Sequence, residues 1–305
     1  MKHVDHKILA HFHEILLGWY KQNGRSFPWR ETSDPYRIVI SEMMLQQTQT
    51  SRVLPKYLEF LDKFPTWKDL ANASQSDVIR AWQGLGYNSR AMRLHMLAKA
   101  VVKDHHGILP DDYETLMHLP GIGPYTAGAV MVFAFRQALP FYDVNIKRVL
   151  SRYFYEIEEQ QTLKEKDVKN LVENVYDQEH PYEFFQTIMD IGATLCLANS
   201  ATCSDCPLRK KCATRPEVDH DPLVFRIQRT QKNLPKKMAF KDTKRFRRGR
   251  IMDVLREEEE MISQTILYNK YKKQVEGADR KEFEEILGTL KKEGLIFQTN
   301  NKYHL

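Results

Sequence analysis

Residues 119–128 read Leu119-Pro120-Gly121-Ile122-Gly123-Pro124-Tyr125-Thr126-Ala127-Gly128. This pattern predicts the end of one helix, a hairpin with two glycines, and a second helix that begins with small residues. Gly121 and Gly123 allow the backbone to turn with positive φ and expose N–H groups at the start of the second helix, where phosphate oxygens can bind regardless of sequence. The pattern is typical of a helix–hairpin–helix motif; a plain tight corner between two helices is the alternative.

The segments around this hairpin, from Ile8 to about Cys212, have a helical pattern as well. Apolar residues recur at spacings of three and four, and prolines and glycines interrupt them at short intervals. The run Thr66-Trp67-Lys68-Asp69 before Leu70 is typical of the capped start of a short helix. No run of residues alternates as strands do. We therefore predict an all-α body built from short helices around a cleft.

The size and composition favour a soluble protein inside the cell. The 305 residues, 42% of them apolar, can bury a substantial core and divide into two domains. The longest apolar run, Ala127–Phe135, is too short to cross a bilayer, and Met1–His6 lacks the apolar core of a signal peptide. We expect a cytoplasmic location, nucleoid-associated in a prokaryote, and no membrane partner. The net charge of +6 mildly favours a polyanionic partner.

Positive charge is concentrated in one part of the chain. Residues 213–250 contain twelve Lys or Arg against four Asp or Glu, an excess of +8. Such a run is either a solvated linker or a phosphate contact, and composition leaves both open. We predict a first domain over residues 1–215, a basic linker over 216–243 and a second domain over 244–305.

The second domain has a winged-helix-like pattern, in which helices precede a short β-hairpin turning at Asn300-Asn301. The predicted helices cover residues 249–257, 263–271 and 279–293, and the predicted strands cover 295–297 and 302–305. Small helical modules of this length also serve in dimerisation or protein docking. The third helix is acidic at its start, which argues against its insertion into a major groove.

All four cysteines lie in one short stretch: Cys196, Cys203, Cys206 and Cys212, spaced C-x6-C-x2-C-x5-C. Thiolates at such intervals can converge on one soft metal or on an iron–sulfur cluster, whereas two disulfides in so tight a loop would strain each other. Four sulfurs also suit zinc. Zinc ribbons usually carry two close pairs, however, and here a single CxxC pair has one cysteine on either side. The spacing therefore favours a cluster.

Two carboxylates stand in contexts that suit acid–base chemistry. Asp143, in Phe141-Tyr142-Asp143-Val144-Asn145-Ile146-Lys147-Arg148, follows an apolar run and precedes a helix, so a simple N-cap is its alternative role. Glu42 is embedded in Val39-Ile40-Ser41-Glu42-Met43-Met44-Leu45-Gln46-Gln47-Thr48. Burial among apolar neighbours would favour its protonated form, whereas an exposed helix position is the alternative.

Several further segments complete a family pattern. They are Phe27-Pro28-Trp29-Arg30, Ser41 to Gln49, Gly84-Leu85-Gly86-Tyr87, and Met189-Asp190-Ile191-Gly192-Ala193 before Cys196. Together with the hairpin, the aspartate and the cysteines, they resemble the endonuclease III superfamily of DNA glycosylases, and within it the MutY-type adenine glycosylase branch, over about residues 8 to 215. The resemblance implies a helix–hairpin–helix glycosylase fold with an iron–sulfur loop.

The same resemblance implies the cofactor and the partner. The four cysteines would hold a structural [4Fe–4S] cluster that shapes a DNA-binding loop, which here would include Arg209, Lys210 and Lys211. The partner would be double-stranded DNA that contains a mismatched or damaged base, bound by a monomer. A monofunctional glycosylase is implied, because Tyr125 occupies the position where lyase-active relatives carry a lysine.

Residue roles follow from the resemblance too. Glu42 would protonate the purine at N7, and Asp143 would face the oxocarbenium sugar as a carboxylate, an ionisation favoured by its helix start. The implied adenine pocket comprises Arg30, Leu45, Gln186, Trp29 and Met189. The implied DNA contacts are the wedge residues Gln47 and Tyr87, together with Gly121, Gly123, Asn145 and Lys147. Taken alone, Gln186 would be a polar residue on a helix surface.

Some residues depart from the family pattern. Val144 replaces a typical glycine, Asn88 a second tyrosine, and Phe185 an asparagine. The roughly sixty residues after Lys244 are too few for the β-rich, Nudix-like domain of full-length MutY proteins, which checks for 8-oxoguanine. We predict removal of adenine opposite guanine or 8-oxoguanine in base excision repair. The alternatives are a thymine or uracil mismatch glycosylase acting opposite guanine, and a non-catalytic DNA-binding damage sensor.

Overall fold

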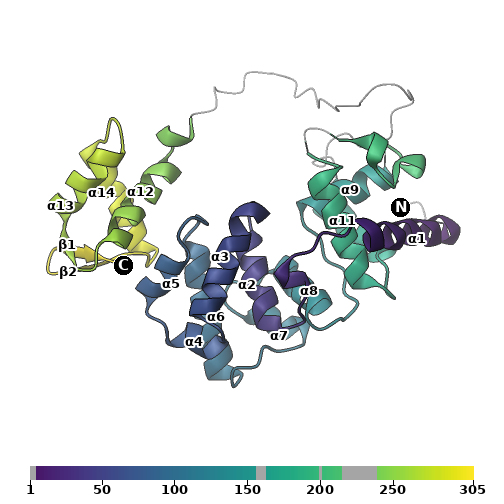
Figure 1. Ribbon diagram of the computed structural model, residues 1–305, viewed down its shortest axis with the longest axis horizontal. Helices are drawn as coiled ribbons and strands as arrows, with labels where there is room; N and C mark the ends of the chain where they lie inside the picture. The colour runs from purple at the N-terminus through teal and green to yellow at the C-terminus, as the bar shows by residue number, and fades with distance from the viewer. Residues whose placement is uncertain (1–4, 156–162, 199–200, 215–238) are drawn as a thin grey trace. The chain divides into compact units, whose positions relative to one another are not determined.

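A computed structural model describes residues 5–155, 163–198, 201–214 and 239–305. The described chain is mainly α-helical, as predicted, and its strands lie only near the C-terminal end (Figure 1). It forms two compact units, each made of segments that are separated in sequence. Unit 1 comprises Met1–Ile38, Asp111–His118 and Ile122–Lys232, and unit 2 comprises Val39–Pro110, Leu119–Gly121 and Asn233–Leu305.

Unit 1 is organised around the helix α11. This helix (Pro181–Thr194) packs against both α1 (His6–Asn23) and α9 (Val144–Phe154), as Figure 1 shows. Aromatic rings fill the core between the three helices: Phe12 stacks on Tyr153 at 4.5 Å between ring centroids and meets Phe184 edge-on. The unit also contains α7 (Tyr113–His118), α8 (Pro124–Phe133) and α10 (Glu165–Val175).

The first part of unit 2 is a set of short helices around α6. These are the end of α2 (Pro35–Leu45), α3 (Thr50–Lys63), α4 (Trp67–Asn72), α5 (Gln75–Ala81) and α6 (Ser89–Asp104). The predicted cap is confirmed, since the Thr66 hydroxyl accepts the Asp69 N–H at 3.2 Å. Ser74 caps α5 in the same way. Helices α4 and α5 therefore each have a capped start, and the fully buried Trp82 directly follows α5.

The predicted hairpin joins α7 to α8. Gly121 has φ +79°, and a Cβ atom there would lie 2.8 Å from Arg93 Cβ, so both the turn and the close approach require glycine. The prediction of positive φ was wrong for Gly123, which has φ −114° and is the N-cap of α8. Pro124 then opens the helix, because a missing N–H costs nothing in the first turn.

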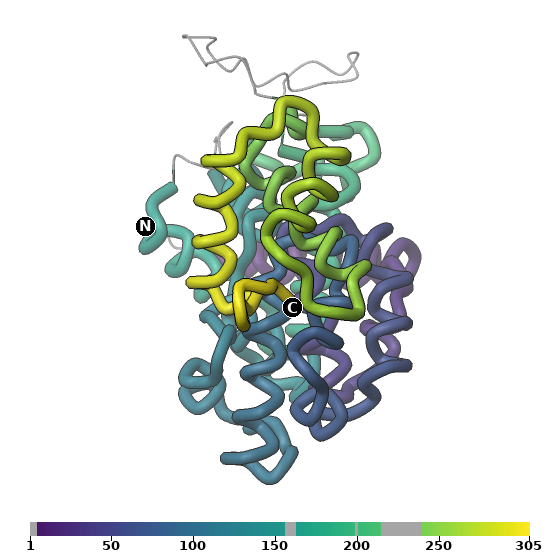
Figure 2. Tube along the Cα trace, turned by 90° about the vertical axis from the view of Figure 1, so that its left-hand side faces the viewer, coloured from purple at the N-terminus to yellow at the C-terminus, as the bar shows by residue number. Residues whose placement is uncertain are grey.

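The C-terminal region has the element order of a winged helix. The elements are α12 (Lys244–Glu257), β1 (Ile262–Ser263), α13 (Gln264–Gln274), α14 (Arg280–Lys292), β2 (Phe297–Thr299) and β3 (Lys302–His304). Figure 2 shows the three helices packed side by side. The antiparallel sheet has the order β1-β3-β2, and the hairpin turns at Asn300 and Asn301, both with positive φ. The predicted order of three helices and a hairpin is confirmed, but α12 begins at Lys244 rather than 249 and β2 at Phe297 rather than 295. The prediction also missed β1, which is too short to show a periodic pattern.

The two compact units divide the chain differently from the predicted domains. Residues 244–305 fall in unit 2 together with 39–110. Most of the predicted linker, 216–238, lies outside the described residues, so the three-part division stays a prediction. Within the described ranges, no helix is both long and apolar enough to span a membrane.

Candidate active site and cysteine cavity

Asp143 is the N-cap of α9. Its Oδ1 atom accepts the backbone N–H groups of Asn145 at 2.9 Å and Ile146 at 2.7 Å, and its Oδ2 atom accepts the Asn145 side-chain amide at 2.7 Å. The predicted capping role is therefore real. Residue 143 as a whole is partly exposed, and the helix start holds its carboxylate in one orientation.

The helix start is not the largest influence on the pKa of Asp143. A helix start and three N–H donors alone would lower its pKa. Burial of the carboxylate in its dense surroundings outweighs those hydrogen bonds and raises the pKa of Asp143 above its ordinary value. The carboxylate is therefore a stronger base than an exposed aspartate, which suits a group that meets a developing positive charge.

A chain of hydrogen bonds links Asp143 to the first cysteine. The Oδ1 atom of Asn145 accepts from Arg148 Nη2 at 2.8 Å, and Arg148 Nε donates to the Cys196 carbonyl at 2.7 Å. Arg148 also donates to the Gly192 carbonyl at 2.6 Å. A Cβ atom at Gly192 would lie 2.8 Å from Asn145 Cβ, so glycine there lets α11 come close to this network. Sequence reasoning missed Arg148, because the Cys196 and Gly192 carbonyls that it binds are distant in sequence.

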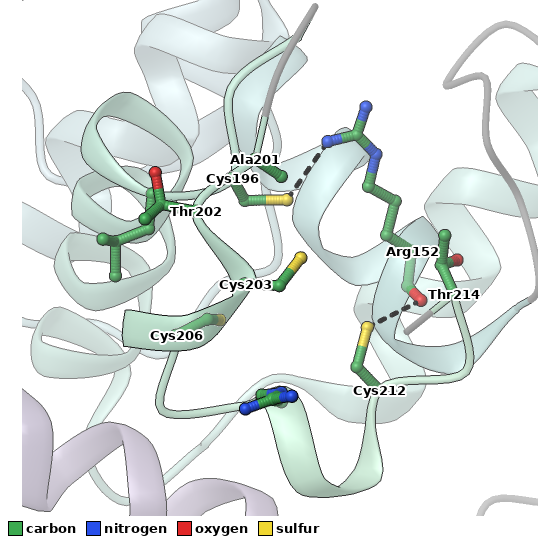
Figure 3. Close-up of a pocket in the computed structure, with 10 residues that line it drawn as sticks. Arg152, Cys196, Ala201, Thr202, Cys203, Cys206, Cys212 and Thr214 are labelled. Atoms are coloured by element: carbon green, nitrogen blue, oxygen red, sulfur yellow. Dashed lines mark hydrogen bonds between the residues drawn. The ribbon is translucent and has the colours of Figure 1, made fainter. Parts of the chain in front are cut away.

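The four cysteines line one cavity. It holds about 440 Å³ of space between atoms, part of it open to solvent, and its lining also includes Arg152 and Thr214. Figure 3 shows the cysteine side chains around this space. Arg152 Nη1 donates to Cys196 Sγ at 3.3 Å, and Cys212 Sγ donates to the Arg152 carbonyl at 3.3 Å. Helix α9 thus holds both ends of the cysteine loop.

The cavity presents the donor set of a soft metal group. All four cysteines are free thiols. Burial raises the pKa of Cys203, and it raises the pKa of Cys206 to about 12. Among the described residues, no three Cys, His, Asp or Glu side chains meet closely enough to hold one metal ion. Four cysteine thiolates are the ligand set of a [4Fe–4S] cluster, and the four thiols around this cavity are the residues that could hold one. The basic turn η4 (Arg209–Lys211) lies in this loop.

Glu42 lies on α2 in unit 2 and is buried, with only 5% of its surface exposed. The alternative of an exposed helix position is therefore wrong. Its neighbours Met43 and Met44 are also buried, as the sequence predicted. Asp143 belongs to unit 1, and the cooperation of the two carboxylates stays a prediction.

Gln186 is buried on α11, with 5% of its surface exposed, so it is not the surface residue that its type alone would suggest. Trp29 is also buried and stacks on Phe27 at 4.9 Å between ring centroids. Met189 and Leu45 are partly exposed. Gln186, Trp29 and Met189 belong to unit 1, whereas Leu45 belongs to unit 2. Their assembly into one adenine pocket stays a prediction.

Arg30 has a structural partner that sequence reasoning did not find. Its Nη1 and Nη2 atoms each donate at 2.8 Å to the fully buried Asp190, and Arg25 Nε donates to the same carboxylate at 2.6 Å. Burial acts to raise the pKa of Asp190, but the two arginines outweigh it and hold the pKa below its ordinary value. Arg30 therefore fixes the 25–30 segment to α11, and contact with a base would use its remaining N–H groups.

The two predicted wedge residues share an unusual backbone conformation in unit 2. Gln47 has φ 54° and Tyr87 has φ 47°, the left-handed region that costs free energy for residues other than glycine. Both are exposed. Such strain persists only where the surrounding structure enforces it, and it is common at ligand-contacting turns.

Arg90 joins these two turns and was not predicted. It is buried, with 5% of its surface exposed. Its Nη1 atom donates to the Met43 and Met44 carbonyls at 2.8 and 2.9 Å, and its Nη2 atom donates to the Leu85 and Gly86 carbonyls at 3.0 and 3.1 Å. The planar guanidinium therefore fixes the chain before Gln47 against the chain before Tyr87.

The remaining predicted residues lie on helices α8, α9 and α11 of unit 1. Tyr125 is in the first turn of α8 and meets Phe141 edge-on at 5.7 Å. Lys147 Nζ lies 3.9 Å from Glu165, an exposed partner that solvent screens. Val144 is 65% exposed beside Asp143, whereas Phe185 is fully buried against Phe141 at 4.2 Å. Phe185 thus belongs to the core behind the Asp143 segment.

The chain is similar to known base excision repair proteins. Residues 40–174 match the HhH-GPD superfamily of base excision DNA repair proteins. The chain is 40% identical over 243 residues to a Mycobacterium tuberculosis protein named adenine DNA glycosylase, which covers 79% of this chain and 77% of that protein.

Two solved structures support the fold. One, described as a thermostable thymine-DNA glycosylase, has 31% identity and a TM-score of 0.63, and covers 68% of this chain and 96% of its own. The other, a trapped covalent complex of endonuclease III with DNA, has 20% identity and a TM-score of 0.58 over 68% of this chain and 96% of its own, and shows the fold alone. This chain belongs to the adenine DNA glycosylase family, within the helix–hairpin–helix superfamily of base excision repair enzymes.

Proposed function

We propose that this chain is a monofunctional DNA glycosylase that removes adenine mispaired with guanine or 8-oxoguanine in double-stranded DNA. The observation that carries the proposal is the carboxylate of Asp143, which three N–H donors hold in one orientation at the start of α9. The relative named adenine DNA glycosylase, identical at 40% of aligned positions, supports the base.

The proposed reaction uses two carboxyl groups with opposite duties. Glu42, buried on α2, donates its proton to adenine N7, so that the C1′–N9 bond breaks with the base leaving as a neutral molecule. The carboxylate of Asp143 stabilises the oxocarbenium charge on the sugar. Water then adds to C1′ and loses a proton to a carboxylate, which leaves an abasic site.

The position of Tyr125 supports hydrolysis without strand cleavage. A β-lyase reaction through a Schiff base needs an amine at the sugar, and Tyr125 offers only a phenol in the first turn of α8. We therefore propose that the strand stays intact after the base leaves.

We also propose that the four cysteines hold a [4Fe–4S] cluster. The common cavity, the four free thiols and the contacts of Arg152 to both ends of the loop support it. When bound, the cluster would give structure to the loop and take no part in the bond-breaking step. Its thiolates would offset the positive charge of Arg152.

The proposed wedge consists of Gln47 and Tyr87. Their exposure and left-handed backbone, enforced by Arg90, support insertion into the base stack when adenine turns out of the duplex. We propose that the chain acts as a monomer. The helix–hairpin–helix turn at Gly121 and Gly123 would bind phosphates through its backbone N–H groups.

A duplex panel tests the base that is removed. The purified chain is incubated with A:G, A:8-oxoG, T:G and U:G duplexes, and alkali then cleaves any abasic sites. We expect scission at adenine in the first two duplexes, and only after alkali. Scission with T:G and U:G alone would replace the proposal with the thymine or uracil activity, which the 31% identical thymine-DNA glycosylase structure makes the specific rival.

A further inference from the structure

The C-terminal region from Lys244 to Leu305 is fixed to helix α5 within unit 2. Arg80 donates to the backbone carbonyls of Arg256 and Glu258, the second at 2.7 Å. Ile79 is fully buried in the same apolar cluster as the core of the C-terminal region. The Gln75 side chain donates to the Gly294 carbonyl. Polar and apolar contacts thus hold α12 in a defined place on this face.

The contact continues to the residue after Tyr87. Arg256 Nη2 donates to Asn88 Oδ1 at 2.8 Å, and the Arg256 side chain is only 6% exposed. A tyrosine at position 88, as in the family pattern, would offer no amide oxygen there. Asn88 therefore provides an acceptor for Arg256 of α12, and this hydrogen bond places α12 next to the turn that contains Tyr87.

Arg245, in the first turn of α12, lies directly on that turn. Its guanidinium carbon is 3.9 Å from the centroid of the Tyr87 ring, and its Nη1 atom donates to the Tyr87 hydroxyl at 2.8 Å. A Cβ atom at Gly86 would lie 3.5 Å from Arg245 Nη2. Arg245 therefore stacks on the ring and covers the backbone beside it.

The neighbouring arginines of α12 are already neutralised. Arg247 pairs with Glu282, Arg248 with Glu293, and Arg250 with Asp253. Arg245 is exposed, and within the described ranges no carboxylate pairs with it. The basic run from 244 to 250 is thus neither a solvated linker nor a uniform basic patch. Its unneutralised guanidinium stands beside Tyr87.

We propose that Arg245 binds a backbone phosphate of duplex DNA beside Tyr87, so that the C-terminal region completes the duplex-binding surface at the wedge. A guanidinium that stacks on a ring through its face keeps N–H groups at its edge for phosphate oxygens. The contact carries no base information and holds for matched and mismatched duplexes alike. It rests on the proposed function only in placing Tyr87 at the DNA.

Binding at several salt concentrations tests the proposal. The full chain is titrated with undamaged duplex and with a duplex that contains a tetrahydrofuran abasic analogue. We expect Arg245→Ala to weaken both by a similar factor and to reduce the slope of log K against log salt by about 1. Arg245→Lys should keep the slope, since it keeps the charge. An unchanged slope for Arg245→Ala would overturn the proposal.

Arg248→Ala is the matched control, because it removes the same charge from the same helix at a side chain paired with Glu293. We expect it to keep the wild-type slope. If its slope fell as much as that of Arg245→Ala, the contact would be a general charge effect and the proposal would be wrong. Thermal unfolding of both variants checks that α12 stays in place.

A second measurement tests the link to Tyr87. In a double-mutant cycle of Arg245→Ala and Tyr87→Ala, we expect losses in duplex binding that are not additive, since the two side chains touch. Additive losses would contradict a shared contact. Binding of undamaged duplex involves no base release, so the binding measurements and the duplex panel test different claims. If Arg245 set the salt dependence of binding but the chain released no adenine, the proposed function would be wrong and the Arg245 contact would stand.

Discussion

The side-chain amide of Asn145 donates to the carboxylate of Asp143 at 2.7 Å. The other end of the same amide accepts from Arg148, whose Nε atom binds the Cys196 carbonyl at 2.7 Å. One residue in the first turn of α9 therefore connects the candidate catalytic carboxylate to the cysteine loop. A substitution at the Asp143 carboxylate or in the cysteine loop should therefore also affect the other site.

Asn145→Ala should shift the pH profile of base release. The amide stabilises the ionised form of Asp143, so its loss raises a pKa that burial has already raised. Because the reaction needs the carboxylate, activity falls when Asp143 becomes protonated. The acidic limb of the pH–rate profile should therefore move to higher pH by about one pH unit, the effect of one charge-assisted hydrogen bond. Single-turnover rates from pH 4.5 to 8 measure the shift. Asn174→Ala on the exposed face of α10 is the control, and equal profiles for the two variants would contradict the link.

Asp143→Asn should stabilise the fold near neutral pH. The folded pKa of Asp143 lies above its unfolded value of about 3.9, so ionisation destabilises the fold as pH rises through that interval. Asparagine cannot ionise and still caps α9. We expect a melting temperature at pH 7 higher by on the order of 2 °C than that of the wild type, with the gain lost below about pH 4. A lower melting temperature at pH 7 would show that the carboxylate is favourable in the fold.

Asp190→Asn should have the opposite effect. The folded pKa of Asp190 is lowered, so its ion pairs with Arg25 and Arg30 stabilise the fold above the unfolded pKa and are lost as pH falls through the folded pKa. Leaving two arginines without a carboxylate should cost about 3–5 kcal/mol at pH 7. Urea unfolding at pH 7 and at pH 3 should show this difference shrinking in acid. The exposed Asp62→Asn on α3 should change neither value.

Arg90→Ala should disorder both wedge turns. Four backbone carbonyls lose their donor in a buried site, which should cost about 3 kcal/mol or more. Arg90→Lys keeps the charge, but the single ammonium group of lysine cannot donate to the carbonyls of both turns as the planar guanidinium does. Urea unfolding gives the cost, and fluorescence of 2-aminopurine placed beside the target base reports loss of base extrusion. Normal extrusion by Arg90→Lys would mean that the two turns need no common tie.

If the four cysteines hold a [4Fe–4S] cluster, the purified protein should be brown. Four thiolates with iron and sulfide absorb broadly near the boundary of visible and ultraviolet light, and Cys203→Ala should abolish this colour. Because α9 holds the loop through Arg148 and Arg152, the same variant should also slow base release. Iron and sulfide analysis beside the spectrum completes the measurement. A colourless protein with one zinc ion would reject the cluster.

Local patterns in the sequence predicted most of the helices and the clustering of the four cysteines. The glycine at position 121, the caps at Thr66 and Asp143, and the Asn300-Asn301 hairpin each act through neighbours a few residues away. Such signals can be read without a fold. Gly123 was misjudged because an N-cap glycine and a left-handed glycine look the same in sequence.

The arginines that hold the site together could not be predicted. Arg90, Arg148 and Arg245 each also bind a partner 42 to 158 positions away, and a basic side chain on a helix gives no sign of such a partner. The raised pKa of Asp143 could not be predicted for the same reason, since burial comes from residues brought in by the fold. The residues adjacent to Gln186 in the sequence likewise gave no indication that it is buried.

Single-turnover release of adenine from an A:8-oxoG duplex, measured for the wild type, Glu42→Gln and Asp143→Asn, tests the central claim most directly. We expect each variant to lose at least about 100-fold in rate, because one loses the proton donor and the other the charge that faces the sugar. Both should still bind the duplex at near wild-type affinity. Release by either variant at the wild-type rate would contradict the account.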